Sequence, residues 1–237
     1  MFSLELLKAI NEWQRGGGRK QRARRGEYLK RLSKDLDPEF RQTRLCCFRQ
    51  MALDVKYLWK LGDELQLAEA ISSWTLATDM AKDFKGGVPP EGWQGVIFEV
   101  VPKASEVIVN LDALYRDRCF LKACEEARAK IPDFQEGIGR YGGSQREVVL
   151  EINSLPVEAV YALGGYSSSR EQTACLFFGR EPSKEEFAVF GALLAASGRE
   201  LGPTWVAGKA KSRVIASMLR TVEALKTADS EPSLDRD

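Results

Sequence analysis

The sequence predicts a fold of the α+β class, with helices at both ends of the chain and strands gathered in its middle. Residues 2–14 carry apolar side chains at the spacing of an amphipathic helix, and helical patterns return at residues 182–197 and 206–226. Between these ends, short apolar runs such as residues 95–101 and 146–152 are typical of strands. Strands and helices do not alternate regularly, which disfavours a chain of βαβ units.

The N-terminal part of the chain is expected to contain two helices and a strand. The first helix ends at the glycines of residues 16–18, since consecutive glycines break a helical pattern. A second helix is expected over residues 25–36 and ends before Asp37-Pro38, because the residue before a proline avoids the helical conformation. Residues 40–49 predict the first strand.

The middle and C-terminal parts are expected to contain most of the strands. Residues 66–71 predict a helical turn, and residues 75–84 predict a helix that the Thr75 hydroxyl caps. Residues 131–143 are expected to form a long loop. The remaining predicted strands cover residues 95–101, 106–111, 146–152, 157–163 and 174–178, and the remaining helices cover residues 114–130, 182–197 and 206–226.

Charge is distributed unevenly along the chain, although the net charge is only +1. Residues 1–60 hold 15 Lys and Arg against 7 Asp and Glu, whereas the remaining residues hold 20 against 27. Much of the basic excess lies in residues 15–25, a run that can follow a phosphate backbone, bind an acidic partner or form a solvated mobile arm. We prefer the solvated arm, with nucleic-acid binding as the alternative.

Composition disfavours several classes of protein. No apolar run approaches the ~20 residues that a membrane-spanning helix needs. The N-terminal segment carries Glu5, Lys8 and Glu12, so it lacks the apolar core of a signal peptide. The chain has no histidine, and its five cysteines show no C-x-x-C spacing, which argues against a zinc site and a histidine-based catalytic triad. We therefore expect a cytoplasmic protein with reduced cysteines and no metal.

Two polar residues stand at the entrance of the apolar run 146–152. Because alternate residues of a strand point to the same face, Gln145 and Glu147 are expected to project together. The preceding Gly142-Gly143 permits the positive φ angles of a tight loop. A carboxylate and an amide on one face at a strand end are suited to binding a sugar.

Three separated motifs, taken in order, give the chain a resemblance to a known family. They are the strand Leu45-Cys46-Cys47-Phe48-Arg49, the sequence Ser73-Trp74-Thr75 with the helix that follows it, and Gln145-Arg146-Glu147. Together they resemble the arginine, serine-x-threonine and glutamine-x-glutamate signature of toxin-type ADP-ribosyltransferases. The resemblance covers residues 44–163 and includes the strand pattern at residues 95–98.

The resemblance implies a fold, a substrate and a set of site residues. Residues 41–180 would form a mixed β core of two packed sheets with helices, between a basic helical extension at residues 1–40 and a helical extension at residues 181–237. NAD would be the substrate, without a metal. The site residues implied are Glu147 and Gln145 for catalysis and Arg49, Ser73, Thr75, Phe84 and Tyr141 for binding NAD, with Phe84 or Tyr141 against the nicotinamide.

The chemistry of NAD cleavage fits these residue types. An arginine binds a pyrophosphate through forked, charge-assisted hydrogen bonds, which is the role implied for Arg49. Breaking the nicotinamide–ribose bond develops positive charge on the ribose, so a carboxylate such as Glu147 stabilises the transition state more than the ground state. By resemblance, Ser73 orients Glu147 and Gln145 positions the acceptor group.

Each motif also has an interpretation without chemistry. Arg49 is then a surface arginine, and Arg44 is an equal candidate for the arginine of the signature. Ser73-Trp74-Thr75 is then a helix cap with a buried tryptophan, and Glu147 is a solvated residue that discourages pairing at a sheet edge. Glutamine at position 145, where the family often has a second glutamate, argues against protein arginine as the acceptor.

The function that the resemblance implies is transfer of ADP-ribose from NAD to a macromolecular acceptor, either protein or RNA/DNA. The protein would be an intracellular toxin or defence effector, with an antitoxin or regulatory protein as a further partner. The alternative is a non-catalytic nucleic-acid-binding or interaction module that uses the basic N-terminal segment. A third interpretation is a degenerate fold that binds NAD without transfer.

Overall fold

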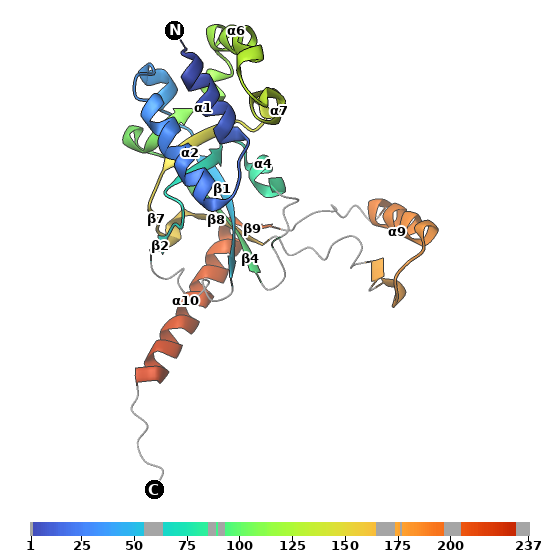
Figure 1. The fold of residues 1–237 in the computed structure, drawn as a ribbon. Helices are drawn as coiled ribbons and strands as arrows, with labels where there is room; N and C mark the ends of the chain where they lie inside the picture. The colour runs from blue at the N-terminus through green and yellow to red at the C-terminus, as the bar shows by residue number, and fades with distance from the viewer. Residues whose placement is uncertain are drawn as a thin grey trace. The chain divides into compact units, whose positions relative to one another are not determined.

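The structure is a computed structural model that describes residues 2–54, 64–84, 89, 93–164, 174–175, 177–196 and 205–230. Its fold is mixed α+β, which confirms the predicted class. Figure 1 shows the helices and strands of these ranges along the chain.

Nine strands occur in the described ranges. They are β1 (Cys47–Asp54), β2 (Leu65–Gln66), β3 (Ile71–Thr75), β4 (Trp93–Val100), β5 (Val107–Asn110), β6 (Glu147–Glu151), β7 (Ser154–Leu155), β8 (Val160–Gly164) and β9 (Trp205–Ala207). Seven of them form one sheet in the order β5-β6-β3-β1-β4-β8-β9, and β2 pairs with β7 in a two-stranded sheet. Every strand pair with a defined register is antiparallel.

Eight α-helices occur in the same ranges. They are α1 (Leu4–Gln14), α2 (Arg19–Leu32), α4 (Thr78–Asp83), α5 (Leu111–Leu114), α6 (Arg118–Ala127), α7 (Ile138–Tyr141), α9 (Lys184–Ala196) and α10 (Gly208–Ser230). The predicted N-terminal helix and the last two predicted helices are present. The predicted loop at residues 131–143 contains α7, which sequence reasoning missed.

The chain divides into two compact units, one of residues 1–49, 63–81 and 98–159 and the other of residues 50–62, 82–97 and 160–237. In the first unit, α1 and α2 lie side by side (Figure 1), and α2 packs on β3 and β5. The apolar side chains of these elements share one core. Its members include Leu6, Leu7, Ile10, Trp13, Leu29, Ile71, Val109 and Val149.

The basic run at residues 15–25 is part of this folded unit. Most of it lies in α2, which begins earlier than the sequence predicts. Arg22 forms an ion pair with Glu69 at 2.5 Å, and Lys30 forms one with Glu151 of β6 at 2.6 Å. The preferred interpretation as a solvated mobile arm is therefore wrong, because the segment is helical and several of its cations bind acceptors within the unit.

Where the sequence predicts a helical turn at residues 66–71 followed by a helix cap, the structure has the end of β2 and the whole of β3. Trp74 lies within β3, is 2% exposed and donates its indole N–H to Ser72 Oγ at 3.1 Å. Five successive residues of β3 pair with β6, and this ladder determines the local conformation. The Thr75 hydroxyl does accept a hydrogen bond from the Ala77 amide at 3.1 Å, but the helix itself begins at Thr78.

The first predicted strand, at residues 40–49, begins later than expected. Residues Pro38–Arg41 form a 3-10 helix, and β1 starts at Cys47 and continues to Asp54. Phe40 points into the core of the first unit and is 6% exposed. Phe40 is therefore apolar because its ring packs in the core, and not because it belongs to strand β1.

In the second unit, the described residues of the predicted strand at residues 174–178 are helical. The rings of Phe177 and Phe178 lie 5.4 and 6.4 Å from the ring of Phe190 on α9. A short apolar run without alternation fits a strand and a buried helical turn equally well, and the contact with α9 favours the turn. Strand β9, which the sequence does not predict, pairs with β8 through Ala207 and Ala162.

The close packing of α2 on β3 gives the first prediction. A Cβ added at Gly26 would lie 2.8 Å from Ile71 Cγ2 and 3.1 Å from Trp13 Cζ3, which is closer than van der Waals contact. We expect Gly26→Ala to lower the free energy of unfolding by about 1–3 kcal/mol, although alanine favours helix formation by about 1 kcal/mol. Urea unfolding followed by circular dichroism measures this.

The matched control is Ala23→Gly at an exposed position of the same helix. Its expected cost of about 1 kcal/mol comes from helix propensity alone. A Gly26→Ala variant that is more stable than the native protein would show that α2 is not packed tightly on β3.

Candidate functional site

The three strands that carry the sequence motifs are neighbours in the sheet, in the order β6-β3-β1. Thr75 lies opposite Glu147, and Ser73 lies opposite Val149, two positions further along β6. Directly opposite residues of an antiparallel pair, and alternate residues of one strand, share a face. Glu147, Ser73 and Thr75 therefore share one face of the sheet, although more than seventy positions separate β3 from β6 in the chain.

Glu147 is a buried carboxylate with donors from two elements. Its side chain and backbone are 5% exposed. Ser73 Oγ donates a hydrogen bond to Glu147 Oε1, and Trp13 Nε1 of α1 donates to the same oxygen at 2.8 Å. Burial raises the pKa of the Glu147 carboxyl, while hydrogen bonds from Ser73, Trp13 and Gln14 act in the opposite direction.

Gln14 adds an amide to this environment. It is 8% exposed, and the Tyr115 hydroxyl donates to Gln14 Oε1 at 2.7 Å. Because the oxygen end of the amide is engaged by Tyr115, the nitrogen end is the one available to Glu147. Gln14 Nε2 is buried and has no acceptor at hydrogen-bonding distance among the described residues, so its effect on the pKa of Glu147 is the smallest of the three donors.

Arg49 contacts the main chain of Ser73, the residue whose hydroxyl donates to Glu147. Its Nη1 donates to Ser73 O at 3.1 Å, and its Nη2 lies 3.9 Å from Glu69 Oε2. Burial lowers the pKa of Arg49 to about 10, although the charge of Glu69 raises it. Arg44, the equal candidate in the sequence, is exposed and has no ion pair or hydrogen bond with the described residues, so Arg49 is the arginine that the structure brings to Ser73.

Gln145 is not placed as the sequence predicts. Strand β6 begins at Glu147, and Arg146 has a φ of 47°, in the left-handed region. The two-residue alternation therefore does not extend back to Gln145, and the expectation that Gln145 and Glu147 project together from one strand is wrong. Instead, the main-chain oxygen of Gln145 accepts a hydrogen bond from Thr75 Oγ1 at 2.8 Å.

The two aromatic candidates lie in different units. Phe84 belongs to the second unit and is 49% exposed. Tyr141 ends α7 in the first unit, is half-buried, and has the guanidinium of Arg140 over its ring at 5.3 Å from the centroid. The main-chain oxygen of Tyr141 also accepts a hydrogen bond from Ser144 Oγ at 2.5 Å, which shapes the loop leading to Gln145.

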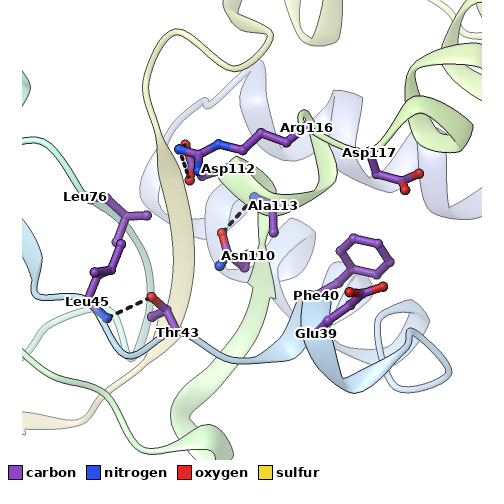
Figure 2. Close-up of a pocket in the computed structure, with 10 residues that line it drawn as sticks. All are labelled: Glu39, Phe40, Thr43, Leu45, Leu76, Asn110, Asp112, Ala113, Arg116 and Asp117. Atoms are coloured by element: carbon purple, nitrogen blue, oxygen red, sulfur yellow. Dashed lines mark hydrogen bonds and ion pairs between the residues drawn. The ribbon is translucent and has the colours of Figure 1, made fainter.

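A pocket of about 370 Å³ borders the segment that precedes Glu147. Figure 2 shows its lining, in which Asp112 pairs with Arg116 at 2.8 Å. Asp112 also accepts from Arg146 Nε at 3.3 Å, and the Leu76 amide donates to Arg146 O at 3.0 Å. These contacts hold Arg146 in its left-handed conformation. The lining residues are Glu39, Phe40, Thr43, Leu45, Leu76, Asn110, Asp112, Ala113, Arg116 and Asp117.

Sequence reasoning missed Trp13, Gln14, Tyr115 and Asp112. For Gln14 a signal exists, because residues 7, 11 and 14 occupy one face of an amphipathic helix and two of these positions are polar. Asn11 and Gln14 are both buried, at 1% and 8% exposure, which a polar residue tolerates only with hydrogen-bond partners. Nothing in the sequence indicates that the partners lie near Glu147.

Within the described ranges, no group of three or more His, Cys, Asp or Glu side chains is arranged to hold a metal ion. None of the helices in these ranges is both long enough and apolar enough to cross a membrane. Comparison of the chain with protein-family models, with curated proteins and with solved structures gives no match. Functional inference therefore depends on the geometry around Glu147.

The raised pKa of Glu147 predicts how stability depends on pH. The native state binds the Glu147 proton more tightly than the unfolded chain, so the native protein loses stability as pH rises above about 4.5 and through the pKa of the folded state. Glu147→Gln has no proton to lose at this position. We therefore expect the free energy of unfolding of this variant, relative to that of the native protein, to rise over this range and then to level off. Urea unfolding between pH 4 and pH 8 measures the difference.

The control is Glu158→Gln, which removes one carboxylate from an exposed position. A difference between Glu147→Gln and the native protein that stays constant or shrinks with rising pH would contradict the burial of an ionisable Glu147.

Proposed function

We propose that the protein is a mono-ADP-ribosyltransferase that transfers ADP-ribose from NAD to a macromolecular acceptor. The observation that carries this proposal is the hydrogen bond from Ser73 to Glu147 across adjacent strands, with Arg49 bound to the main chain of the same serine. Three motifs that resemble the transferase signature thus meet at one residue. We further propose that the sheet carrying them is an ADP-ribosyltransferase-like core.

Glu147 would act in its ionised form. Cleavage of the nicotinamide–ribose bond places positive charge on the ribose, and a carboxylate fixed beside it lowers the energy of that transition state. The Ser73 hydroxyl fixes the Glu147 side chain and favours its ionised form. Low solvent exposure strengthens the interaction between carboxylate and cation, because less water screens the charges.

Arg49 would bind the pyrophosphate of NAD. Its guanidinium is the most strongly desolvated cation near Ser73, and its only described ion pair, to Glu69, is long at 3.9 Å. Most of its charge is therefore available for a phosphate oxygen. Thr75 has a different role, since its hydroxyl holds the main chain of Gln145 and so fixes the segment that the acceptor would approach.

Two observations favour a protein acceptor over RNA or DNA. The pocket beside Arg146 is lined by three carboxylates, Glu39, Asp112 and Asp117, against one guanidinium, Arg116, so its net negative charge repels a phosphate backbone. In addition, Arg22 and Lys30 of the basic helix already bind carboxylates within the chain. The position of Gln145 before Glu147 still argues against protein arginine as the modified residue.

The cellular role that accompanies this activity is also a proposal. By resemblance, the protein is an intracellular toxin or defence effector that works in the cytoplasm, and an antitoxin or regulatory protein is a further partner. A non-catalytic nucleic-acid-binding module is the competing function. The ion pairs of Arg22 and Lys30 in α2 weigh against it, because cations that are already paired bind phosphate less strongly.

The test uses purified full-length protein with NAD labelled in its adenylate part and a total cell extract. We expect label to appear on protein and to decrease at least about 100-fold in Glu147→Gln, because a fixed charge at the reacting centre contributes a factor of this size. Glu158→Gln, with the same change at an exposed position, is expected to retain activity.

Label on RNA or DNA instead would support the transferase and change its acceptor class. Binding of NAD without transfer or hydrolysis would support a degenerate fold. Neither NAD binding nor turnover, together with salt-sensitive binding of nucleic acid, would favour the non-catalytic module.

A pair of arginine variants tests the NAD-binding role. We expect Arg49→Lys to raise the KM for NAD about tenfold, because lysine cannot form the forked contact to a pyrophosphate. The matched variant is Arg44→Lys, at the exposed arginine five positions earlier in the sequence, which is expected to leave the KM unchanged. Equal effects of the two changes would remove Arg49 from the site.

A further inference from the structure

Helix α1 supplies side chains to the environment of Glu147 that no sequence motif includes. Trp13 is 6% exposed and its indole N–H lies 2.8 Å from Glu147 Oε1, the oxygen that Ser73 Oγ also contacts. The next residue, Gln14, has its amide oxygen bound by the Tyr115 hydroxyl, and its buried amide nitrogen acts on Glu147 without reaching hydrogen-bonding distance. Two consecutive residues of one helix thus face a carboxylate that is 134 positions from Trp13.

We propose that Trp13 and Gln14 are positioning residues for Glu147, which makes α1 a functional part of the candidate site. This inference rests on the proposed transferase function. The hydrogen bonds from Trp13 and Ser73 both end on Glu147 Oε1. Among the described residues, none ends on Glu147 Oε2. The donors therefore fix the plane of the carboxylate and leave one oxygen for a substrate hydroxyl.

Buried side chains and hydrogen bonds hold α1 in place. Leu7 and Ile10 are 1% and 0% exposed in the core of the first unit. Asn11 donates to Pro132 O at 2.9 Å and accepts from the Ile138 amide at 3.0 Å. These bonds join α1 to the main chain of the segment that leads to Gln145. The donors of α1 are thus held by a rigid support, as a positioning function requires.

Burial raises the pKa of Glu147, and the hydrogen-bond donors around it lower that pKa, with no ion pair among the described residues to add to them. Among the described residues, no lysine or arginine forms an ion pair with Glu147. The titratable group that faces it is Tyr115, and burial keeps the pKa of that phenol above its usual range, so it stays neutral. Several charged side chains on the adjoining elements are held by other partners: Glu12 by Arg15 and Arg25, Lys30 by Glu151, and Arg146 by Asp112.

Removing a donor from the carboxylate therefore has a defined effect. Trp13→Phe keeps an aromatic ring in the core but deletes the N–H group, and Gln14→Met keeps the chain length but deletes the amide. Each change makes the ionised form of Glu147 less favourable. The fraction of active enzyme then falls at low pH and recovers at higher pH, whereas a general loss of structure lowers activity at all pH values.

The experiment combines a pH profile of NAD turnover with a direct titration of Glu147. Full-length protein carrying ¹³C at the glutamate carboxyls is titrated by NMR, and the Glu147 signal is assigned from its absence in Glu147→Gln. We expect Trp13→Phe to move the Glu147 titration, and the acid limb of kcat, upward by about one pH unit, a tenfold change in ionisation. Gln14→Met is expected to move both in the same direction by less.

Ile10→Val is the control for packing, because it removes one methyl group from the same helix without touching Glu147. Its thermal unfolding temperature is expected to fall while its titration and pH profile stay in place. Titrations of Trp13→Phe and Gln14→Met that match the native protein would overturn the inference. If the Glu147 titration shifts in the two variants but the native protein does not turn over NAD, the action of α1 on Glu147 is supported and the transferase function is refuted separately.

Discussion

Burial of the Glu147 carboxylate is the constraint on which the rest of the first unit depends. An ionised carboxylate without partners is very costly inside a protein, and here no cation pairs with it in the described part of the chain. The cost is offset by hydrogen bonds from Ser73 on the neighbouring strand and Trp13 on the covering helix. Strand register and helix position must both be correct for these donors to reach one oxygen atom.

Strand register meets this requirement through the β3–β6 ladder. Five consecutive residue pairs join these strands, from Ile71 and Glu151 to Thr75 and Glu147. A slip by one residue would turn Ser73 away from Glu147 and would place Trp74 on the face that α1 covers. The large indole of Trp74, which is buried on the other face, therefore helps to hold the serine in place. The middle residue of the Ser-x-Thr motif thus has a structural function beside the function proposed for its neighbours.

The segment before Glu147 meets a second requirement, which is a sharp change of direction. The left-handed conformation of Arg146 ends the alternation of side chains, and the Asp112 ion pair and the Leu76 amide hold it. Such a conformation costs of the order of 1 kcal/mol in a residue with a Cβ. Its presence directly before a buried carboxylate is consistent with strain that is kept because the position of Glu147 depends on it.

The sequence predicts the fold class, the N-terminal helix and the strands that hold Arg49 and Glu147, because these depend on local periodicity. It predicts Ser73 as part of a helix cap, since serine and threonine favour caps and only pairing with β6 shows otherwise. The prediction for Gln145 is wrong because it assumes that side chains alternate between faces before the strand begins. An arginine at position 146 gives no sign of a positive φ. Trp13 belongs to the site through tertiary packing alone, which periodicity does not describe.

The distance in sequence between Trp13 and Glu147 has a consequence for synthesis. Ribosomes make the N-terminus first, so α1 exists long before β6, and 134 positions separate the two partners. During that interval the core that contains Leu7 and Ile10 of α1 still lacks Val149 of β6. The candidate site therefore cannot assemble until β6 is made, and any activity it has begins only after residue 151 has emerged.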